Sequence, residues 1–255
     1  MEYLMLAVAA IVASTLTGTV GVGGALLLVP VLTVMADVFG LLPAEIRFTG
    51  YMMNFISLAP IVFRNRHNID WQVAKYLVAS SVLGAVVGAN IPHVVSDKAL
   101  LLALAVVLLI IILLLMRKLY DTTPAQPDFS HTPRSLMGIS AIGGVVGLAS
   151  GLFGIGGGIF MLPLVSLLLG VKPKSIILLT PLVVLFSTGS GIAASLWHGM
   201  AFSNVPLVVI TVLGAMVGAE WGDKLRGKLS DKALNILIIG LLGLLAAKIF
   251  MQEIM

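Results

Sequence analysis

The chain of 255 residues is 59% hydrophobic and only 10% charged, and it carries a net charge of +4 and no cysteine. A soluble domain needs roughly a quarter of its residues charged to cover its surface, so this composition excludes a soluble globular protein and predicts one embedded in lipid. The missing cysteines exclude disulfides and thiolate chemistry. We expect no metal site and no other cofactor, and we assign the positive charge to cytoplasmic loops rather than to nucleic-acid binding.

The first apolar stretch, at about 3–36, contains a cluster of glycines and is too long for one straight span. A single helix over it would be about 51 Å long at about 1.5 Å per residue, whereas the hydrocarbon core of a bilayer is only about 30 Å thick. The stretch therefore either kinks as one crossing or folds back as a hairpin of two helices. Three ordinary spans follow it, predicted at about 45–63, 71–91 and 97–117.

A polar segment with three prolines, at 120–134, separates two membrane halves. Because such segments are typical of linkers, we divide the chain into a first membrane repeat at 1–119, a cytoplasmic linker at 120–134 and a second membrane repeat at 135–255. The second half also starts with a glycine-broken apolar stretch and continues with three spans, predicted at about 136–170, 176–197, 204–220 and 232–250.

The two halves form an internal repeat, because glycines and prolines recur in the same order 133 residues apart. In the first apolar stretch of each half, Gly18, Gly21, Gly23, Gly24 and Pro30 correspond to Gly151, Gly154, Gly156, Gly157 and Pro163. Further on, Leu83–Ala89 matches Leu213–Ala219, and Ser96–Leu100 recurs unchanged at Ser230–Leu234. Such ordered matches indicate a duplicated structural unit.

The distribution of lysine and arginine separates the two forms of the broken stretch. If it crosses once, both halves share one orientation and the basic residues divide seven against eight; if it is a hairpin, the second half is inverted and they divide twelve against three. The positive-inside rule favours the uneven division. We therefore predict an all-α polytopic protein of the bacterial inner membrane with two inverted repeats, each a glycine-broken helical hairpin plus three transmembrane helices, and with both termini periplasmic.

The glycine breaks are the candidate anion-binding site. Glycine permits a positive φ and a close approach of a ligand to bare backbone, and the helix that follows each break begins with unpaired N–H groups at the positive end of its dipole. Two such helix ends meeting in the membrane would bind an anion without a buried cation, as in other transporters with broken helices. The candidates from the two breaks are Gly21, Gly23, Gly24 and Ala25, and Gly154, Gly156, Gly157 and Gly158.

Polar residues within the spans supply further candidates, because polar groups in lipid must face protein or a cavity. We select Asn54, Thr188 and Arg47, although a threonine also bonds back to helix carbonyls and Arg47 could pair with Glu45. Ser57, Thr180, Ser187 and Ser190 lie in the same two spans. For the glycine pairs spaced as small-xxx-small we expect close helix packing instead, at Gly84 and Gly88, and at Gly214 and Gly218.

The duplicated glycine cluster followed by proline, together with the two LGAxVGA segments, resembles the TauE/SafE family of bacterial anion permeases over nearly the whole chain. The copies differ, since Ala25 stands where the second copy has Gly158. The family is associated with the export of sulfite and the movement of sulfonates such as sulfoacetate. The resemblance therefore implies a secondary transporter, an exporter of a small sulfur-containing anion.

The mechanism expected of inverted repeats is alternating access. A passive anion channel, or a membrane component of a sulfur pathway without transport activity of its own, stay as alternatives. We do not expect an enzyme, because the spans offer only hydroxyls, one asparagine and glycine. Proton or sodium coupling and a homo-oligomeric state are left open, since no acidic residue lies clearly in mid-membrane.

Overall fold

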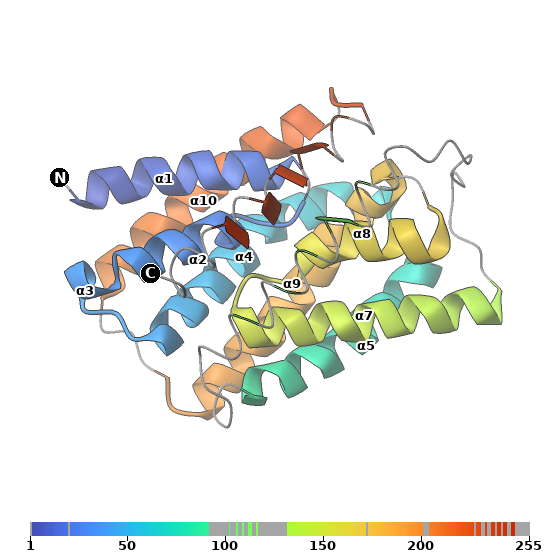
Figure 1. Cartoon of the computed structure of the whole chain (residues 1–255), viewed down its shortest axis with the longest axis horizontal. Coiled ribbons are helices and arrows are strands. Elements are labelled where there is room, and N and C mark those ends of the chain that lie inside the picture. The colour runs from blue at the N-terminus through green and yellow to red at the C-terminus, as the bar shows by residue number, and fades with distance from the viewer. Residues whose placement is uncertain are drawn as a thin grey trace.

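The computed structural model describes residues 2–19, 21–91, 132–171, 173–200, 204–226 and 228–230, and scattered positions within 102–116 and 233–247. The elements that it resolves in these ranges are helices (Figure 1). The last span predicted in each half, the repeated segment that begins with Ser-Asp and most of the predicted linker lie outside the described residues. The all-α class predicted from composition is confirmed.

The glycine clusters break both long apolar stretches, as predicted. In the first half, α1 (Glu2–Gly18) and α2 (Ala25–Val34) are separate helices, and in the second half α7 (Pro133–Phe153) and α8 (Gly158–Leu169) are separate in the same way. The α1–α2 hairpin opens toward the end of the molecule that holds the N-terminus, and the α7–α8 hairpin opens toward the opposite end (Figure 1).

The remaining helices match the predicted spans with small changes at their ends. They are α4 (Pro43–Asn65), α5 (Trp71–Asn90), α9 (Pro173–Trp197) and α10 (Val205–Arg226). Helix α10 runs beyond the predicted end at 220. The one-turn helix α3 (Ala36–Phe39) and the 3-10 turn η1 (Arg66–Asn68) were not predicted.

Local chemistry explains where several helices begin. Asp70 accepts hydrogen bonds from the Gln72 and Val73 amides and so caps α5. Thr132 accepts from the Ser135 amide and caps α7, while Pro133 occupies the first turn, where its missing N–H costs nothing.

Within the described ranges, five helices are long and apolar enough to cross a membrane: Pro43–Asn68, Trp71–Asn90, Pro133–Phe153, Ile176–Trp197 and Val205–Arg226. The chain is thus a multi-pass membrane protein. In contrast, α2 has 10 residues and α8 has 12, which gives about 15 and 18 Å at about 1.5 Å per residue. Both are shorter than the hydrocarbon core, so the helical limb after each break covers only part of the thickness.

The two halves interlock. Helix α5 of the first half packs along α7 of the second, α10 of the second half packs along α1 of the first, and α4 and α9 pack against each other. Added Cβ atoms at Gly84 and Gly88 would overlap with Gly144 and Leu148 backbone oxygens of α7. In the other pair, Gly218 and Gly222 pack in the same way against Ile11 and Thr15 of α1, and Gly214 against Ala10. The packing predicted for these glycines is confirmed.

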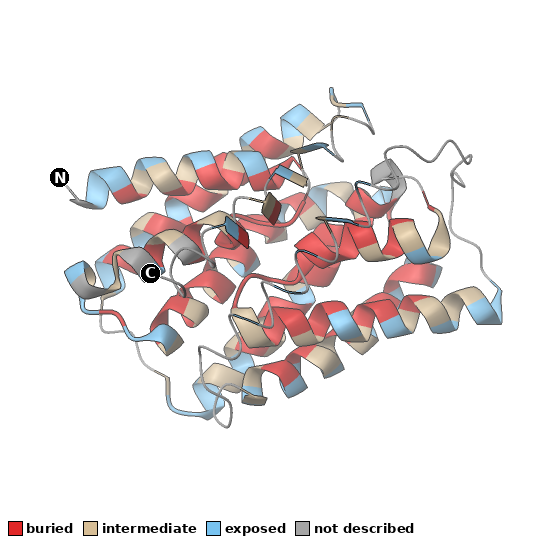
Figure 2. Ribbon diagram, in the orientation of Figure 1, coloured by how far each residue is buried: buried red, intermediate tan, exposed pale blue. Residues whose placement is uncertain are grey.

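Buried residues gather where the helices face one another, and exposed residues lie on the outer faces (Figure 2). Many of these exposed residues are large and apolar. Leu4, Met5, Val8 and Val12 of α1 are each more than half exposed. A soluble protein would not present such a stripe, but acyl chains solvate it, so this face of α1 suits contact with lipid.

Candidate functional site

The two breaks follow equivalent backbone paths. Gly21 and Gly23 have φ values of 77° and 84°, and their repeat partners Gly154 and Gly156 have 70° and 91°. Residues with a Cβ rarely adopt these conformations, so the repeated glycines are required by the turn itself. The paths then diverge, because Gly157 also has a positive φ, of 65°, whereas its partner Gly24 has φ −69°.

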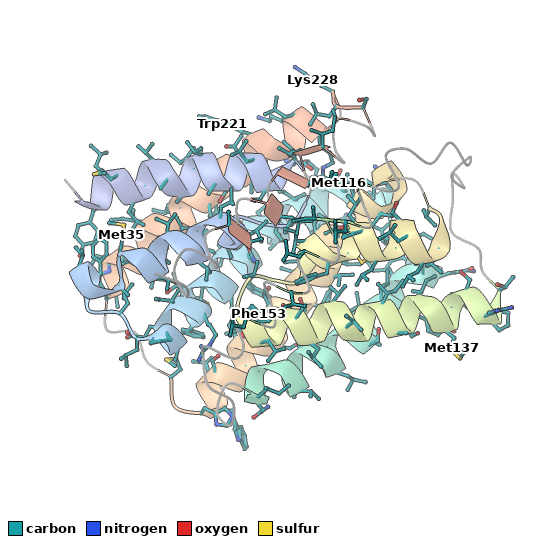
Figure 3. All side chains as sticks on the ribbon, in the orientation of Figure 1. Met35, Met116, Met137, Phe153, Trp221 and Lys228 are labelled. Atoms are coloured by element: carbon teal, nitrogen blue, oxygen red, sulfur yellow. The ribbon has the colours of Figure 1, made fainter. Side chains whose placement is uncertain are left out.

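The breaks meet inside the protein, as predicted. A Cβ added to Gly158, the first residue of α8, would lie 3.1 Å from the Cα atom of Val22 in the first break. Val22 and Ile155, the non-glycine residues at the two tips, are 1% and 3% exposed. Phe153, at the end of α7, accordingly lies near the middle of the molecule, far from Met137 near the start of that helix (Figure 3).

Asn54 joins the two breaks. Its side chain, which is fully buried in the middle of α4, accepts a hydrogen bond from the Ala25 amide at 3.2 Å through Oδ1 and donates one to the Ile155 carbonyl at 2.9 Å through Nδ2. Because the two contacts need an acceptor and a donor respectively, they fix which way the amide points. Among the selected polar candidates, Asn54 is thus placed at the centre of the breaks.

The glycines of the breaks let α4 and α9 approach closely. A Cβ on Gly23 would overlap with Asn54, and one on Gly156 would lie 2.5 Å from Asn54 Nδ2 and 2.7 Å from Val184. Gly21 packs in the same way against Pro181 of α9, and Gly154 packs against the backbone of α4. In this conformation the candidate glycines therefore contact protein atoms.

The other selected residues lie beside the breaks with different partners. Thr188 is fully buried on α9, and its hydroxyl donates to the Val184 carbonyl of its own helix at 2.7 Å. Arg47 is half-buried on α4, and its Cα lies 2.8 Å from the position of a Cβ on Gly154. It precedes Asn54 by about two helical turns, so Arg47 lies nearer to the start of α4 than the Asn54 amide does.

Hydroxyls that were not selected from sequence line the second break. The Ser150 hydroxyl donates to Ser187 Oγ at 3.0 Å, and Ser187 Oγ lies 3.1 Å from the Val184 carbonyl and 3.5 Å from that of Gly156. Ser187 stands 133 residues after Asn54. The repeat offset that links the glycines would therefore have singled out Ser187 as the counterpart of Asn54.

A second polar cluster lies at the ends of α4 and α10. Arg64 donates to both carboxylate oxygens of Glu220 at 3.0 Å and to Asp223 at 2.5 Å, and Asp223 also pairs with Arg226.

No group of three or more possible metal ligands occurs among the residues that the structure describes.

The sequence of the chain matches a known protein family over nearly its whole length. The family described as Sulfite exporter TauE/SafE matches residues 6–249.

This chain belongs to the TauE/SafE family. A probable membrane transporter protein of Methanocaldococcus jannaschii is 25% identical to it over 96% of this chain and 95% of the relative. The probable membrane transporter protein YunE of Bacillus subtilis is 24% identical over 100% and 99%. No solved structure matches the chain. The family and the names of these relatives describe a membrane transporter and not an enzyme.

Proposed function

We propose that this member of the TauE/SafE family is a secondary transporter that exports a small sulfur-containing anion, such as sulfite or an organosulfonate, across the bacterial inner membrane. The observation that carries the proposal is the meeting of two glycine breaks at Asn54 in the protein centre. There the N-terminal ends of α2 and α8 supply partial positive charge without a buried cation. The family's description as a sulfite exporter supports the direction and the substrate class.

The candidate site comprises both glycine breaks with Asn54. Thr188 on α9 is included as a buried neighbour of the second break. Arg47 is included as a cation beside the second break that could guide the anion toward the site. A site at which two broken helices meet is exposed alternately to the two sides when the surrounding helices rock, which is alternating access.

Two features support inverted repeats, and the twelve-to-three division of basic residues supports periplasmic termini. The two broken hairpins open toward opposite ends of the molecule (Figure 1). In addition, the Arg64 ion pairs with Glu220 and Asp223 hold the C-terminal ends of α4 and α10 together. Inverted halves place those ends on one side of the membrane, whereas halves of equal orientation would place them on opposite sides.

Topology is tested with single cysteines in a chain that has none of its own. Lys228→Cys is expected to react with a membrane-impermeant maleimide only after the cytoplasmic side is opened. Leu42→Cys, at a residue 66% exposed between α3 and α4, is expected to react in intact cells. Labelling of both from the same side would exclude the inverted arrangement.

Transport is tested with purified protein in proteoliposomes and radiolabelled sulfite, with sulfoacetate and sulfate as competitors and protein-free liposomes as control. We expect saturable uptake that is accelerated when unlabelled sulfite is preloaded inside, because a carrier exchanges substrate during its cycle. Uptake that neither saturates nor responds to preloading would indicate a passive channel. No uptake of any sulfur anion by folded protein would reject the proposed substrate class.

A further inference from the structure

The beginning of α2 is capped in an unusual way. Helices commonly begin with Ser, Thr, Asp or Asn, whose side chain accepts from the first free amides. Helix α2 instead begins after Gly24, which gives no side-chain cap, and its first amide, that of Ala25, donates to Asn54 on another helix. A neutral amide oxygen thus occupies the position at which the positive end of a buried helix would receive an anion.

A second observation at the same place is the hydroxyl of Ser14. Ser14 is fully buried on α1, and its Oγ has no hydrogen-bond partner. The atom lies directly against Gly24, because an added Cβ there would overlap with it. Its neighbours Thr15 and Thr17 behave differently, since both hydroxyls donate to the carbonyl one turn back at 2.8 Å.

Buried hydroxyls ordinarily find such a partner, because an unsatisfied polar group loses hydration without compensation. Among the described residues, the other buried hydroxyl without a hydrogen-bond partner is that of Ser57. Ser57 stands three residues after Asn54 on α4, and residues at this spacing lie on the same face of a helix. The two unused donors therefore come from the two helices that flank the start of α2.

We infer that the start of α2 is an oxyanion half-site, that the Asn54 carbonyl oxygen is its internal occupant in the present conformation, and that Ser14 supplies an additional donor to the ligand. This inference rests on the proposed transport function and deepens it. The ligand class is a small oxyanion. One oxygen replaces Asn54 Oδ1 as the acceptor of the Ala25 N–H, and another accepts from Ser14 Oγ.

Replacement of Asn54 Oδ1 by a ligand oxygen also affects the hydrogen bond that joins the first break to the second. The same Asn54 amide donates to the Ile155 carbonyl in the second break. When an anion displaces Oδ1 and the amide turns to donate Nδ2 to it, that bond is released. Occupation of the first break thereby loosens its link to the second.

The second break has no equivalent half-site. The residue that corresponds to Ser14 at the repeat offset is Gly147, which packs against the Ser81 carbonyl of α5. Ser187, which corresponds to Asn54, is engaged with Ser150 instead of with the start of α8. Within the proposed site of two breaks, the inference therefore assigns the direct hydrogen bonds to the ligand to the first break.

Asn54→Asp tests the occupant. The change keeps the side-chain shape but places a carboxyl group at the start of α2, where an ionised oxygen beside the Ala25 amide mimics a bound anion. We expect the wild-type protein to gain Tm on addition of sulfite. In Asn54→Asp we expect this gain to disappear and sulfite uptake to fall by at least about tenfold. Asn65→Asp is the matched control on the same helix, because Asn65 donates only to the Ile61 carbonyl near the helix end; it is expected to keep both properties.

Ser14→Ala tests the additional donor. It keeps the half-site testable even if Asn54→Asp fails to fold. Loss of one hydrogen bond to an anion is expected to raise the KM for sulfite about tenfold or more. The Tm without ligand should stay equal or rise, because the unsatisfied hydroxyl is removed. Ser81→Ala, at a fully buried serine whose hydroxyl donates to the Val78 carbonyl, is the control and should leave the KM unchanged.

The outcomes separate the inference from the proposed function. A wild-type protein that neither transports sulfur oxyanions nor gains Tm from them contradicts the proposed function itself. An active wild-type protein with an unchanged KM in Ser14→Ala, or with normal sulfite uptake in Asn54→Asp, overturns the half-site. A lowered Tm of ligand-free Ser14→Ala without a change in KM would make Ser14 a packing residue only.

Discussion

Both glycine breaks contact Asn54, but the first also contacts the unpartnered hydroxyl of Ser14, whereas the second also contacts Val184 and lies beside a pair of serines bonded to each other. The backbone turns at Gly21 and Gly23 are nevertheless repeated at Gly154 and Gly156. Duplication thus preserved the path of the chain, which only glycine can follow, and allowed the side chains around it to differ. Two breaks with the same backbone turn are therefore surrounded by different polar side chains.

The helix pairs around the breaks show the opposite behaviour, because in both pairs glycines of one helix pack against backbone oxygens of the other. Glycines of α5 meet backbone oxygens of α7, and glycines of α10 meet backbone oxygens of α1. Each pair joins one helix from either half. We therefore expect variants in the two pairs to behave alike and variants in the two breaks to behave differently.

The largest effect is expected from Gly156→Val. At φ 91° a branched side chain is strained, and the valine would also collide with Asn54 and Val184. Backbone strain and overpacking cost about 1–3 kcal/mol each, so we expect a strongly lowered Tm in detergent and loss of sulfite uptake. Gly40→Ala is the control for strain alone, since Gly40 has φ 62° and no atom near its Cβ position. Equal losses of Tm in both variants would show that packing at the break contributes nothing.

A smaller but symmetrical effect is expected from Gly88→Ala and Gly218→Ala. Each added methyl would overlap with a carbonyl oxygen of the partner helix, Leu148 in one pair and Ile11 in the other. We expect each to cost about 1–3 kcal/mol in the free energy of unfolding. By contrast, Gly144→Ala meets nothing within 4 Å and should gain up to about 1 kcal/mol from helix propensity. Very unequal losses in the two pairs would break the proposed equivalence.

Ser187→Ala sharpens the contrast between the breaks. It removes the acceptor of the Ser150 hydroxyl, so we expect a loss of about 1–3 kcal/mol in the free energy of unfolding. Because the inferred ligand lies at the first break, the KM for sulfite measured in proteoliposomes should change less than about twofold, against about tenfold for Ser14→Ala. A larger rise in KM for Ser187→Ala than for Ser14→Ala would move the site to the second break.

The smallest effect is expected from Glu220→Gln in the ion-pair cluster. The side chains of Arg64 and Glu220 are 47% and 33% exposed, and solvated pairs of this kind contribute about 0–1 kcal/mol. We expect a Tm shift of only a few degrees that disappears at high salt. A double-mutant cycle with Arg64→Gln measures the coupling, and a coupling free energy above about 2 kcal/mol would show that the pair is far less hydrated than its exposure suggests.

The membrane class and the positions of both glycine breaks could be predicted from the sequence alone. These properties are local or compositional: few charges cannot cover a soluble surface, and a glycine cluster in an apolar stretch too long for one span must turn the chain there. The packing of Gly84, Gly88, Gly214 and Gly218 followed from their spacing, because small residues four apart form a groove on one helix face.

The side chains that contact the breaks could not be predicted from the sequence and follow from the tertiary structure. The link from Asn54 to Ala25 and Ile155 joins residues 29 and 101 positions away, and no periodicity reports which helix faces which. Nothing in the sequence distinguishes Ser14 from other helical serines. Its unpartnered hydroxyl and its contact with Gly24 follow from the packing of α1 against the first break. The ion pairs of Arg64 likewise needed α10 to extend to Arg226 and to end beside α4, because the free energy of such contacts depends on packing between helices rather than on the sequence of either one.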